Sequence, residues 1–587
     1  MKTVISLICS PVDSGAITLN KYFIRLIREV LSYRRNSSII VVSILASSVI
    51  AMIGPYLIGI ATDSIIALKF KILIFLAAGY LAIYLVNYAA ENRRTKYMMN
   101  TSQEVIKNLR NRAFKKLQYV PLKYYSGKNA GQIISRITND AETLSDFLTF
   151  QLPQVVAGIA GIIASIIIMV YLDPVLTLYA VIIIPMLLAT ILLMNKKIKF
   201  NYINVRRRIA ELTGNVGESI NGIKAIKSSG TEDVFNNNFE SVNSRNYNAN
   251  VRAVRLTSIF SSIVQVIEGL GIIIVLYEGG SEVFGRVISI GILVSFIVYV
   301  QSFFNPIVQL SQFYNSYQSS SIAIERIYKI IDEDADYNTG GNKIPVFKNK
   351  ISFENVSFAY DRERIINGIS MDIRKGQKIA IIGKTGAGKT TLSGLILNFY
   401  KPTSGCITMD GVDINSFNTL EYRKLFGVIL QDPFLFEGTI LENVRFANQD
   451  ISEYAIDAKM EELGLATILG PLGLDAEVGE RGTNLSEGQR QAVSILRAAV
   501  NNPQIIIMDE ATSQLDLKNE GIIQNAIFKF MEGKTIITIA HHLETIVNSD
   551  YIYYLDHGSI LEEGTPEDLM NRGTRFYDLY LKNKLLI

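Results

Sequence analysis

The chain has 587 residues, of which 49% are hydrophobic, and a formal net charge of +4. This length predicts several domains, the mean hydropathy of +0.24 is high for a soluble protein, and the modest charge does not indicate nucleic acid as a partner. The two cysteines, Cys9 and Cys406, lie far apart in sequence and in predicted compartment, and they give no disulfide framework and no metal cluster. All three histidines fall near the C-terminus, which argues against a histidine-rich metal site elsewhere.

The chain begins with a short apolar run, Val4–Cys9, which is too short for a convincing signal-peptide core. In Ile17–Arg35, apolar residues recur near helical spacing with lysines and arginines between them. This pattern predicts an amphipathic helix suited to a membrane surface. A soluble lead-in to the first membrane helix and an organellar transit peptide are the alternatives. We assign residues 1–36 to this cytoplasmic lead-in.

Six segments within residues 37–330 are apolar enough to span a bilayer, which takes about 20 residues each. A soluble core could contain one or two such runs, but not six with these gaps. The predicted spans lie near Ser38–Ile60, Ile72–Ala90, Val155–Leu172, Val175–Met194, Ile259–Tyr277 and Val287–Phe304.

The gaps between the spans alternate in character. Glu91–Thr149 and Asn195–Ser258 are long and rich in lysine and arginine, whereas the other gaps are short and carry few basic residues. By the positive-inside rule, the termini and both long gaps are cytoplasmic, as expected for a multi-pass protein of the plasma (inner) membrane. The long gaps predict helices that continue the spans into the cytoplasm. Each is expected to be broken once, around Ser126–Asn129 and between Thr213 and Gly222.

Beyond a polar linker at residues 331–346, strands and helices alternate through residues 347–587. Gly383–Thr391 reads G-K-T-G-A-G-K-T-T, which fits G-x-x-x-x-G-K-[ST], between an apolar strand-like run and a helix-forming run. Glycines let such a loop wrap around phosphates while backbone N–H groups point inward. Lys389 can then neutralise phosphate oxygens, and the Thr390 hydroxyl can ligate Mg²⁺.

A second apolar strand, Pro503–Met508, ends in Asp509 and Glu510. A parallel sheet presents carboxylates to a bound Mg²⁺-nucleotide at such strand ends. Asp509 is expected to hold the ion, together with Thr390 and Gln431. Glu510 is expected to be the base or water-orienting group for attack on the γ-phosphate.

Together these motifs resemble an ATP-binding cassette (ABC) exporter half-transporter of the multidrug, lipid and peptide exporter type. The resemblance covers nearly the whole chain from about residue 17. It is carried by the Walker A loop Gly383–Thr391, the Walker B strand Ile505–Asp509, the signature Leu485–Gln489, the Q-loop Leu430–Phe436, the D-loop Ser513–Asp516, the H-loop Ala540–His541, the exporter-type segment Glu477–Gly482 and the coupling region Gly131–Asp140.

The resemblance and the chemistry of the residues together predict an ATP and Mg²⁺ site. Tyr360 is expected to stack on adenine, with a core tyrosine at a strand end as the alternative. His541 is expected to contact the γ-phosphate, although a lone histidine is more often structural. The catalytic set is Glu510, His541 and Lys389. The other ATP-binding residues are expected to be Gly383, Lys384, Thr385, Gly386, Gly388, Thr390, Thr391 and Gln431, with Ser486, Gly488 and Gln489 serving the ATP of another copy.

Two positions depart from the family pattern. Glu487 stands in the signature where glycine is usual, and His542 stands where arginine is common. The carboxylate of Glu487 does not fit a contact with a γ-phosphate, unless this side chain points away from the phosphate.

The membrane half also carries polar residues. Glu268 lies inside a predicted span, and an ionisable residue there predicts a functional site. Hydrogen bonding between helices and an interfacial position are the alternatives. The expected wall of a substrate cavity consists of Gln265, Glu268, Gln301, Phe304 and Asn305.

We therefore expect six transmembrane helices with long cytoplasmic extensions, followed by an α/β P-loop ATPase domain. The implied function is ATP-driven export of a hydrophobic or amphipathic substrate by alternating access, within membrane lipids and as a dimer. A homodimer is favoured and a heterodimer is the alternative. A dedicated lipid flippase or peptide exporter, and less readily an ATP-gated channel or regulator, are the competing functions.

Overall fold

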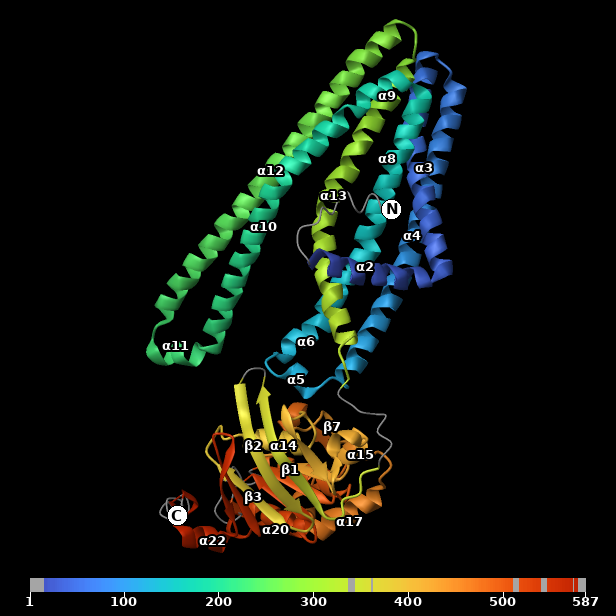
Figure 1. Ribbon diagram of the computed structural model, residues 1–587. Helices are drawn as coiled ribbons and strands as arrows, with labels where there is room; N and C mark the ends of the chain where they lie inside the picture. Colours follow the sequence, from blue (N-terminus) through green and yellow to red (C-terminus); the bar gives the residue numbers. More distant parts are fainter. Residues whose placement is uncertain are drawn as a thin grey trace. The chain divides into compact units, whose positions relative to one another are not determined.

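The computed structural model describes residues 15–335, 344–360, 363–509, 517–539, 546–573 and 575–578. They divide into two compact units (Figure 1). Unit 1 comprises Met1–Gln118 and Asn129–Glu333, and unit 2 comprises Tyr119–Lys128 and Asp334–Ile587. The predicted break around Ser126–Asn129 therefore coincides with a return of the chain from unit 2 to unit 1.

Unit 1 is helical throughout its described part. Its elements are α2 (Gly15–Ser32), α3 (Arg34–Ile66), α4 (Phe70–Leu117), α6 (Ala130–Ile137), α7 (Asn139–Asp146), the π-helical turn η1 (Phe147–Gln151), α8 (Leu152–Leu172), α9 (Pro174–Val181), α10 (Ile183–Asn221), α11 (Ile223–Ser229), α12 (Glu232–Phe284) and α13 (Ile290–Ile331).

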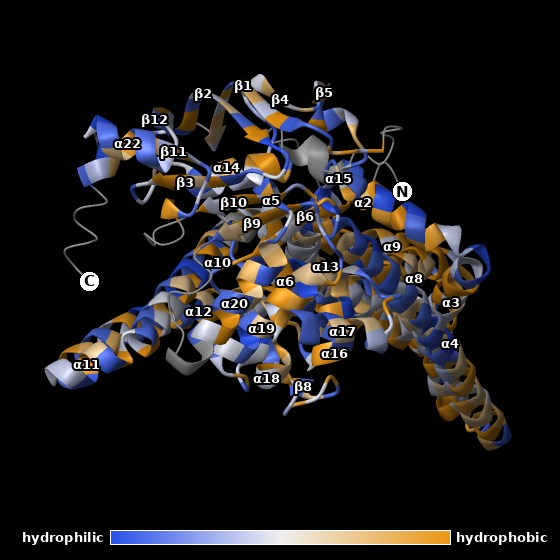
Figure 2. Cartoon of the chain, turned by 90° about the horizontal axis from the view of Figure 1, so that it is seen from below, coloured by the Kyte–Doolittle hydropathy of each residue, from blue (hydrophilic) through white to orange (hydrophobic). Residues whose placement is uncertain are grey.

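Within the described residues, five helical stretches are long and apolar enough to cross a membrane, and a shorter apolar stretch begins α13 at Ile290–Ser302. Figure 2 shows hydrophobic residues running along the arm formed by α3 and α4. Four predicted spans lie within single helices, whereas Val175–Met194 is divided between α9 and α10 and Val287–Phe304 begins three residues before α13. The count of six crossings stays a prediction. As expected, helices continue beyond the apolar segments: α4 extends to Leu117 and α13 to Ile331.

The second long gap breaks at the C-terminal end of the predicted range, Thr213–Gly222. The helix does not break at Thr213, because α10 continues through Gly214 and Gly217 to Asn221. The chain reverses only at Gly222–Thr231, around the short α11. Packing of α10 along α12 offsets the low helix propensity of the glycines.

A carboxylate joins α3 to the start of α13. Asp63 accepts hydrogen bonds from the Ser289 hydroxyl at 2.5 Å and from the Gly291 backbone N–H at 2.8 Å. Ser289 in turn caps α13 by accepting from Ile292 N–H. Gly59 lacks the Cβ that would collide with Ser295 and Gly291, so the two helices can approach closely there.

The amphipathic helix α2 packs against the ends of other helices of unit 1. Leu26 is fully buried, Glu29 forms a 2.8 Å ion pair with Arg112 of α4, and Arg25 forms one of 2.8 Å with Asp332 after α13. The predicted lead-in is therefore a helix that ties α4 to α13.

The described residues of unit 2 form one four-stranded antiparallel sheet, one six-stranded mixed sheet and one two-stranded antiparallel sheet. The strand orders are β2-β1-β4-β5, β12-β11-β3-β10-β9-β6 and β7-β8. The strands are β1 (Lys350–Tyr360), β2 (Glu363–Arg374), β3 (Lys378–Gly383), β4 (Ser404–Met409), β5 (Val412–Asp413), β6 (Phe426–Ile429), β7 (Gly438–Thr439), β8 (Glu477–Val478), β9 (Ile505–Asp509), β10 (Thr535–Ile539), β11 (Tyr551–Asp556) and β12 (Ser559–Gly564).

The helices of unit 2 connect these strands. They are α5 (Leu122–Tyr125), α14 (Lys389–Ile396), η2 (Ile414–Ser416), α15 (Thr419–Arg423), α16 (Ile440–Val444), η3 (Arg445–Ala447), α17 (Glu453–Leu463), α18 (Ala466–Leu469), η4 (Glu480–Gly482), α19 (Glu487–Ala499), α20 (Leu517–Met531) and α22 (Pro566–Arg572).

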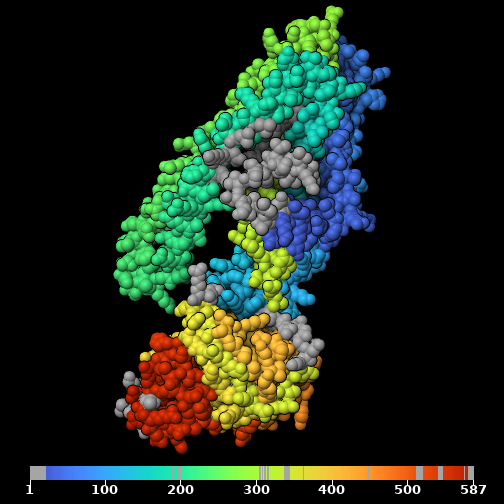
Figure 3. Space-filling view, in the orientation of Figure 1, coloured from blue at the N-terminus to red at the C-terminus, as the bar shows by residue number. Residues whose placement is uncertain are grey.

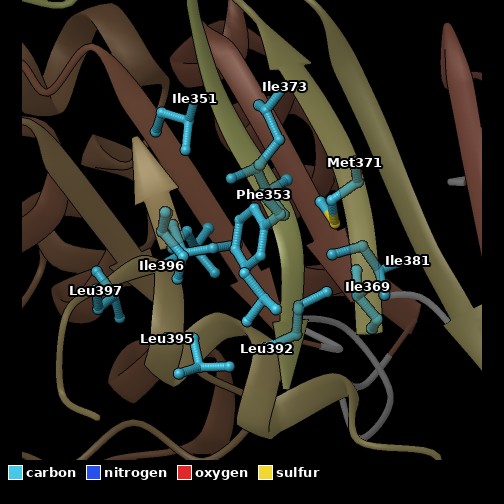
Figure 4. Packing of buried hydrophobic residues seen from close by; sticks show 14 of the residues in the cluster. Ile351, Phe353, Ile369, Met371, Ile373, Ile381, Leu392, Leu395, Ile396 and Leu397 are labelled. Atoms are coloured by element: carbon cyan, nitrogen blue, oxygen red, sulfur yellow. The ribbon is translucent and has the colours of Figure 1, made fainter. Parts of the chain in front are cut away.

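Two larger hydrophobic clusters and one smaller cluster build unit 2. The first joins the antiparallel sheet, α14 and part of the mixed sheet, and Figure 4 shows the Phe353 ring of β1 among Ile369, Leu392 and Ile396. The second cluster joins α16–α20 to the other face of β6, β9 and β10. In Figure 3 the red C-terminal residues lie against the yellow residues of the same unit.

Arg497 of α19 holds the segment after β6 in place. Its guanidinium donates to the Phe434 carbonyl at 2.9 Å, to the Asn443 carbonyl at 2.9 Å and to Asn443 Oδ1 at 2.6 Å. Asn443 is 1% exposed and also bonds the backbone of Phe436. Burial lowers the pKa of Arg497 from its usual value.

Replacing Arg497 with Met should remove all three of these hydrogen bonds and leave Asn443 Oδ1 with the Phe436 N–H alone, at a cost of about 2–3 kcal/mol in stability. Thermal unfolding of the purified chain should show a transition several degrees lower than in the wild type. The exposed Arg481 is a matched control, and an equal shift for Arg481→Met would contradict this role.

Candidate functional site

The phosphate loop, Gly383–Thr391, links β3 to α14 as predicted from the sequence. Gly386 has φ +83° and Gly388, which caps α14, has φ +101°. At Gly388 a Cβ would lie 2.7 Å from the Ile366 side chain, so both backbone angle and space require glycine.

Lys389 is folded back into this loop. Its side chain is buried, with 7% exposure, and Nζ donates to the carbonyls of Gly383 at 2.7 Å and Lys384 at 3.1 Å. The Lys384, Thr385 and Thr390 side chains are exposed. A buried ammonium and a helix N-terminus thus converge on one loop, which fits an anionic phosphate chain.

Strand register brings other predicted residues to the same sheet edge. In the parallel pairs, Ile539 of β10 lies opposite Ile381 of β3 and opposite Asp509 of β9. Ile429 of β6 lies opposite Met508, so Gln431 follows just beyond the level of Asp509. We call the carboxyl ends of β3, β6, β9 and β10 the nucleotide edge.

Tyr360 at the end of β1 is in contact with Tyr400, which follows α14. Their rings meet edge-on, with centroids 5.2 Å apart. Burial raises the pKa of the Tyr400 hydroxyl, the Tyr360 hydroxyl adds to this, and the Ser126 hydroxyl acts in the opposite direction. Ser126 belongs to the segment Tyr119–Lys128, which unit 2 includes. Tyr400 therefore links that segment to the residue predicted to stack on adenine.

The signature, Leu485–Gln489, forms the start of α19. Ser486 caps the helix by accepting from Gln489 N–H at 3.3 Å, and Gln489 Oε1 accepts from Ser486 N–H at 2.8 Å. Gly488 is buried in the first turn, whereas Ser486 is exposed. Glu487 forms an ion pair of 2.9 Å with Arg490, so its carboxylate has a cationic partner within the same turn.

The predicted cavity residues that the structure describes differ in exposure. Gln265 and Gln301 are exposed, and Glu268 on α12 is half-buried. Phe304 is 5% exposed and packs with Val300 and other core residues, which favours a structural role over a cavity wall.

Unit 1 has a polar pocket that the sequence did not indicate. It has a volume of about 410 Å³ and lies between α4, η1, α8 and α13. Polar lining residues include Glu91, Arg94, Thr149, Gln154 and Gln309. No sequence periodicity could predict this pocket, because its residues come from elements far apart in the chain.

Three predicted residues are not placed. Glu510 and His541 lie outside the described residues, as does the D-loop Ser513–Asp516, and the Asn305 side chain is likewise outside them. Their expected roles remain predictions.

Sequence reasoning missed Arg490, Arg497 and Tyr400. Acid–base spacing of three residues could have indicated the Glu487–Arg490 pair. Arg497 and Tyr400 have no such signal, because their partners lie far away in sequence.

Comparisons with known proteins cover both units. The family described as "ABC transporter transmembrane region" matches residues 37–307, and the family described as "ABC transporter" matches residues 366–513. ABC transporter ATP-binding protein YknV of Bacillus subtilis is 33% identical over 94% of this chain and 92% of its own length.

Two further relatives are an exporter and a flippase. The ATP-dependent lipid A-core flippase of Syntrophus aciditrophicus is 30% identical over 91% of this chain and 89% of its own length. The solved structure of a bacterial Atm1-family ABC exporter with ATP bound superposes with a TM-score of 0.79 at 25% identity, over 94% of this chain and 99% of that one. The chain belongs to the ABC transporter family, as an ATP-hydrolysing exporter with a helical membrane domain followed by a nucleotide-binding domain.

Proposed function

We propose that this chain is half of an exporter of the plasma or inner membrane that moves a hydrophobic or amphipathic substrate out of the cytoplasm or the inner leaflet. The observation that carries the proposal is a complete phosphate loop, with buried Lys389, in one chain with helices apolar enough to cross a membrane. The flippase among its relatives supports a lipid or another amphipath as substrate.

The residues of the nucleotide edge fit Mg²⁺-ATP. Lys389 neutralises charge on the terminal phosphates, and the loop glycines let backbone N–H groups approach them. Thr390, Gln431 and Asp509 provide the oxygen ligands that Mg²⁺ prefers. When bound, the ion supplies neutralisation of the charge that develops on the phosphate oxygens. Tyr360 stacks on adenine, Glu510 orients the attacking water and His541 contacts the γ-phosphate.

Replacing Glu510 with Gln should abolish most ATP hydrolysis while leaving ATP binding intact, because the shape is kept and the base is lost. Loss of a general base typically costs about 10²–10⁴-fold in rate. Steady-state hydrolysis and binding of labelled ATP by the purified chain measure the two effects. Glu437→Gln, which changes an exposed acid after β6, is a control. Near-normal turnover in Glu510→Gln would contradict the role of Glu510.

We propose a homodimer in which each signature completes the ATP site of the other chain. One chain has one phosphate loop and one signature, and the exposed Ser486 at the start of α19 offers a hydroxyl and N–H groups to a phosphate. The chain carries both Glu510 and His541, so neither half of the dimer lacks the predicted hydrolytic residues.

The chain expressed alone should therefore purify as a dimer whose Mg²⁺-dependent hydrolysis requires Ser486 as well as Lys389. Mixing inactive Ser486→Ala and Lys389→Ala chains should restore part of the activity, because one of the two sites in a mixed dimer is intact. A folded but inactive lone chain, rescued by a different half-transporter, would overturn the homodimer.

Substrate contact is proposed at two places in unit 1. Glu268 is half-buried within an apolar helix and has no hydrogen bond to another described residue. The polar pocket beside Gln154 and Gln309 adjoins apolar helices, which suits a ligand with a polar head and an apolar body.

If Glu268 contacts substrate, Glu268→Gln should change stimulation of ATP hydrolysis by cationic amphipaths without changing the basal rate. Purified wild-type and variant chains in liposomes would be compared across lipids, drugs and peptides, with Glu240→Gln, which removes an exposed acid from the same helix, as the control. An unchanged profile across charged and neutral compounds would exclude Glu268 from the substrate site.

A further inference from the structure

The signature carries an acid at a place where an anion is expected to bind. Glu487 is the first residue of α19, and the first turn of a helix is where backbone N–H groups and the helix dipole favour negative charge on a ligand. An unpaired carboxylate there would repel the phosphate that the proposed dimer brings to it.

The structure gives this carboxylate a partner on its own helix. Arg490 Nη2 donates to Glu487 Oε2 at 2.9 Å, and the two side chains are 22% and 33% exposed. Arg490 Nη1 also lies 3.4 Å from the Leu485 carbonyl. The stem of Arg490 runs against Gly482, where a Cβ would lie 3.2 Å from Arg490 Cδ. Arg490 is thus held at the side of the first turn by three neighbours.

The N-terminal cap of α19 does not depend on the ion pair between Glu487 and Arg490. Ser486 and Gln489 bond each other through their backbone N–H groups and side chains, so the turn is closed without Glu487. Pairs at i,i+3 on a partly exposed helix surface contribute little to helix stability. The main consequence of the pair is therefore electrostatic, because it cancels one negative charge beside the turn.

We propose that Arg490 is a positioning residue for ATP shared between two chains: it holds the Glu487 carboxylate in an ion pair and so keeps the first turn of α19 able to receive the terminal phosphate. This inference rests on the proposed dimer, in which the signature of one chain meets the ATP of the other. It explains how a signature with glutamate in place of glycine can serve that site.

The test uses the full-length chain in liposomes and compares Arg490→Met, Glu487→Gln and the double variant. Arg490→Met should raise KM for ATP about tenfold and reduce kcat much less, since high ATP overcomes repulsion. Glu487→Gln should remain near the wild type. The double variant should return to within about twofold of Glu487→Gln, because no charge is then left to neutralise.

Two controls separate this electrostatic role from a structural one. Lys459 and Glu462 form an ion pair of 2.8 Å at the same i,i+3 spacing on α17, and Lys459→Met should leave KM unchanged. Added salt should narrow the difference between Arg490→Met and the wild type, because it screens partly exposed charges.

A double variant as impaired as Arg490→Met would overturn the inference, because Arg490 would then act through Leu485 or packing. An unchanged KM in Arg490→Met would overturn it as well. A wild-type chain without ATP hydrolysis would instead contradict the proposed homodimer, so the two failures are distinguishable.

Discussion

Hydrogen bonding between parallel strands holds the nucleotide edge together. The β9 register sets Asp509 level with Ile539 of β10, and through β10 with Ile381 of β3. Asp509 is the last residue of β9, and the loop that leads to Lys389 begins at the end of β3. A shift of one residue in either pairing would move the phosphate loop relative to Asp509 and turn the side chains to the other face. The cores on both sides of the sheet resist such a shift.

The same sheet links the nucleotide to other parts of the chain. Tyr400 follows the phosphate-loop helix α14. Its ring contacts the ring of Tyr360, and its hydroxyl interacts with Ser126 of the segment Tyr119–Lys128. On the other side, Arg497 of the signature helix binds the backbone of the segment that follows Gln431. Both neighbouring segments are therefore in direct contact with residues next to the site.

Much of this could be predicted from the sequence because the motifs are local. The phosphate loop requires glycines at fixed positions, and the strand and helix that flank it can be predicted from the residues directly before and after it. The length of an apolar run likewise predicts a membrane helix. Comparisons with known proteins confirm the predicted family and exporter class.

Other features depend on contacts that no local pattern contains. Phe304 lies in a core built by residues of α8, α9, α10, α12 and α13, and no periodicity along α13 marks it as part of that core. The polar pocket draws residues from α4, η1, α8 and α13. Strand register and such long-range packing follow from the whole fold.

The central claim is that ATP drives a substrate across the membrane, and vectorial uptake tests it most directly. Inside-out vesicles containing the chain would be given a fluorescent amphipath with ATP, with vesicles of the Glu510→Gln chain as the control. The account predicts accumulation against a gradient that needs ATP and stops in the control. Equilibration without accumulation, gated by ATP binding alone and retained in Glu510→Gln, would contradict it and indicate a channel.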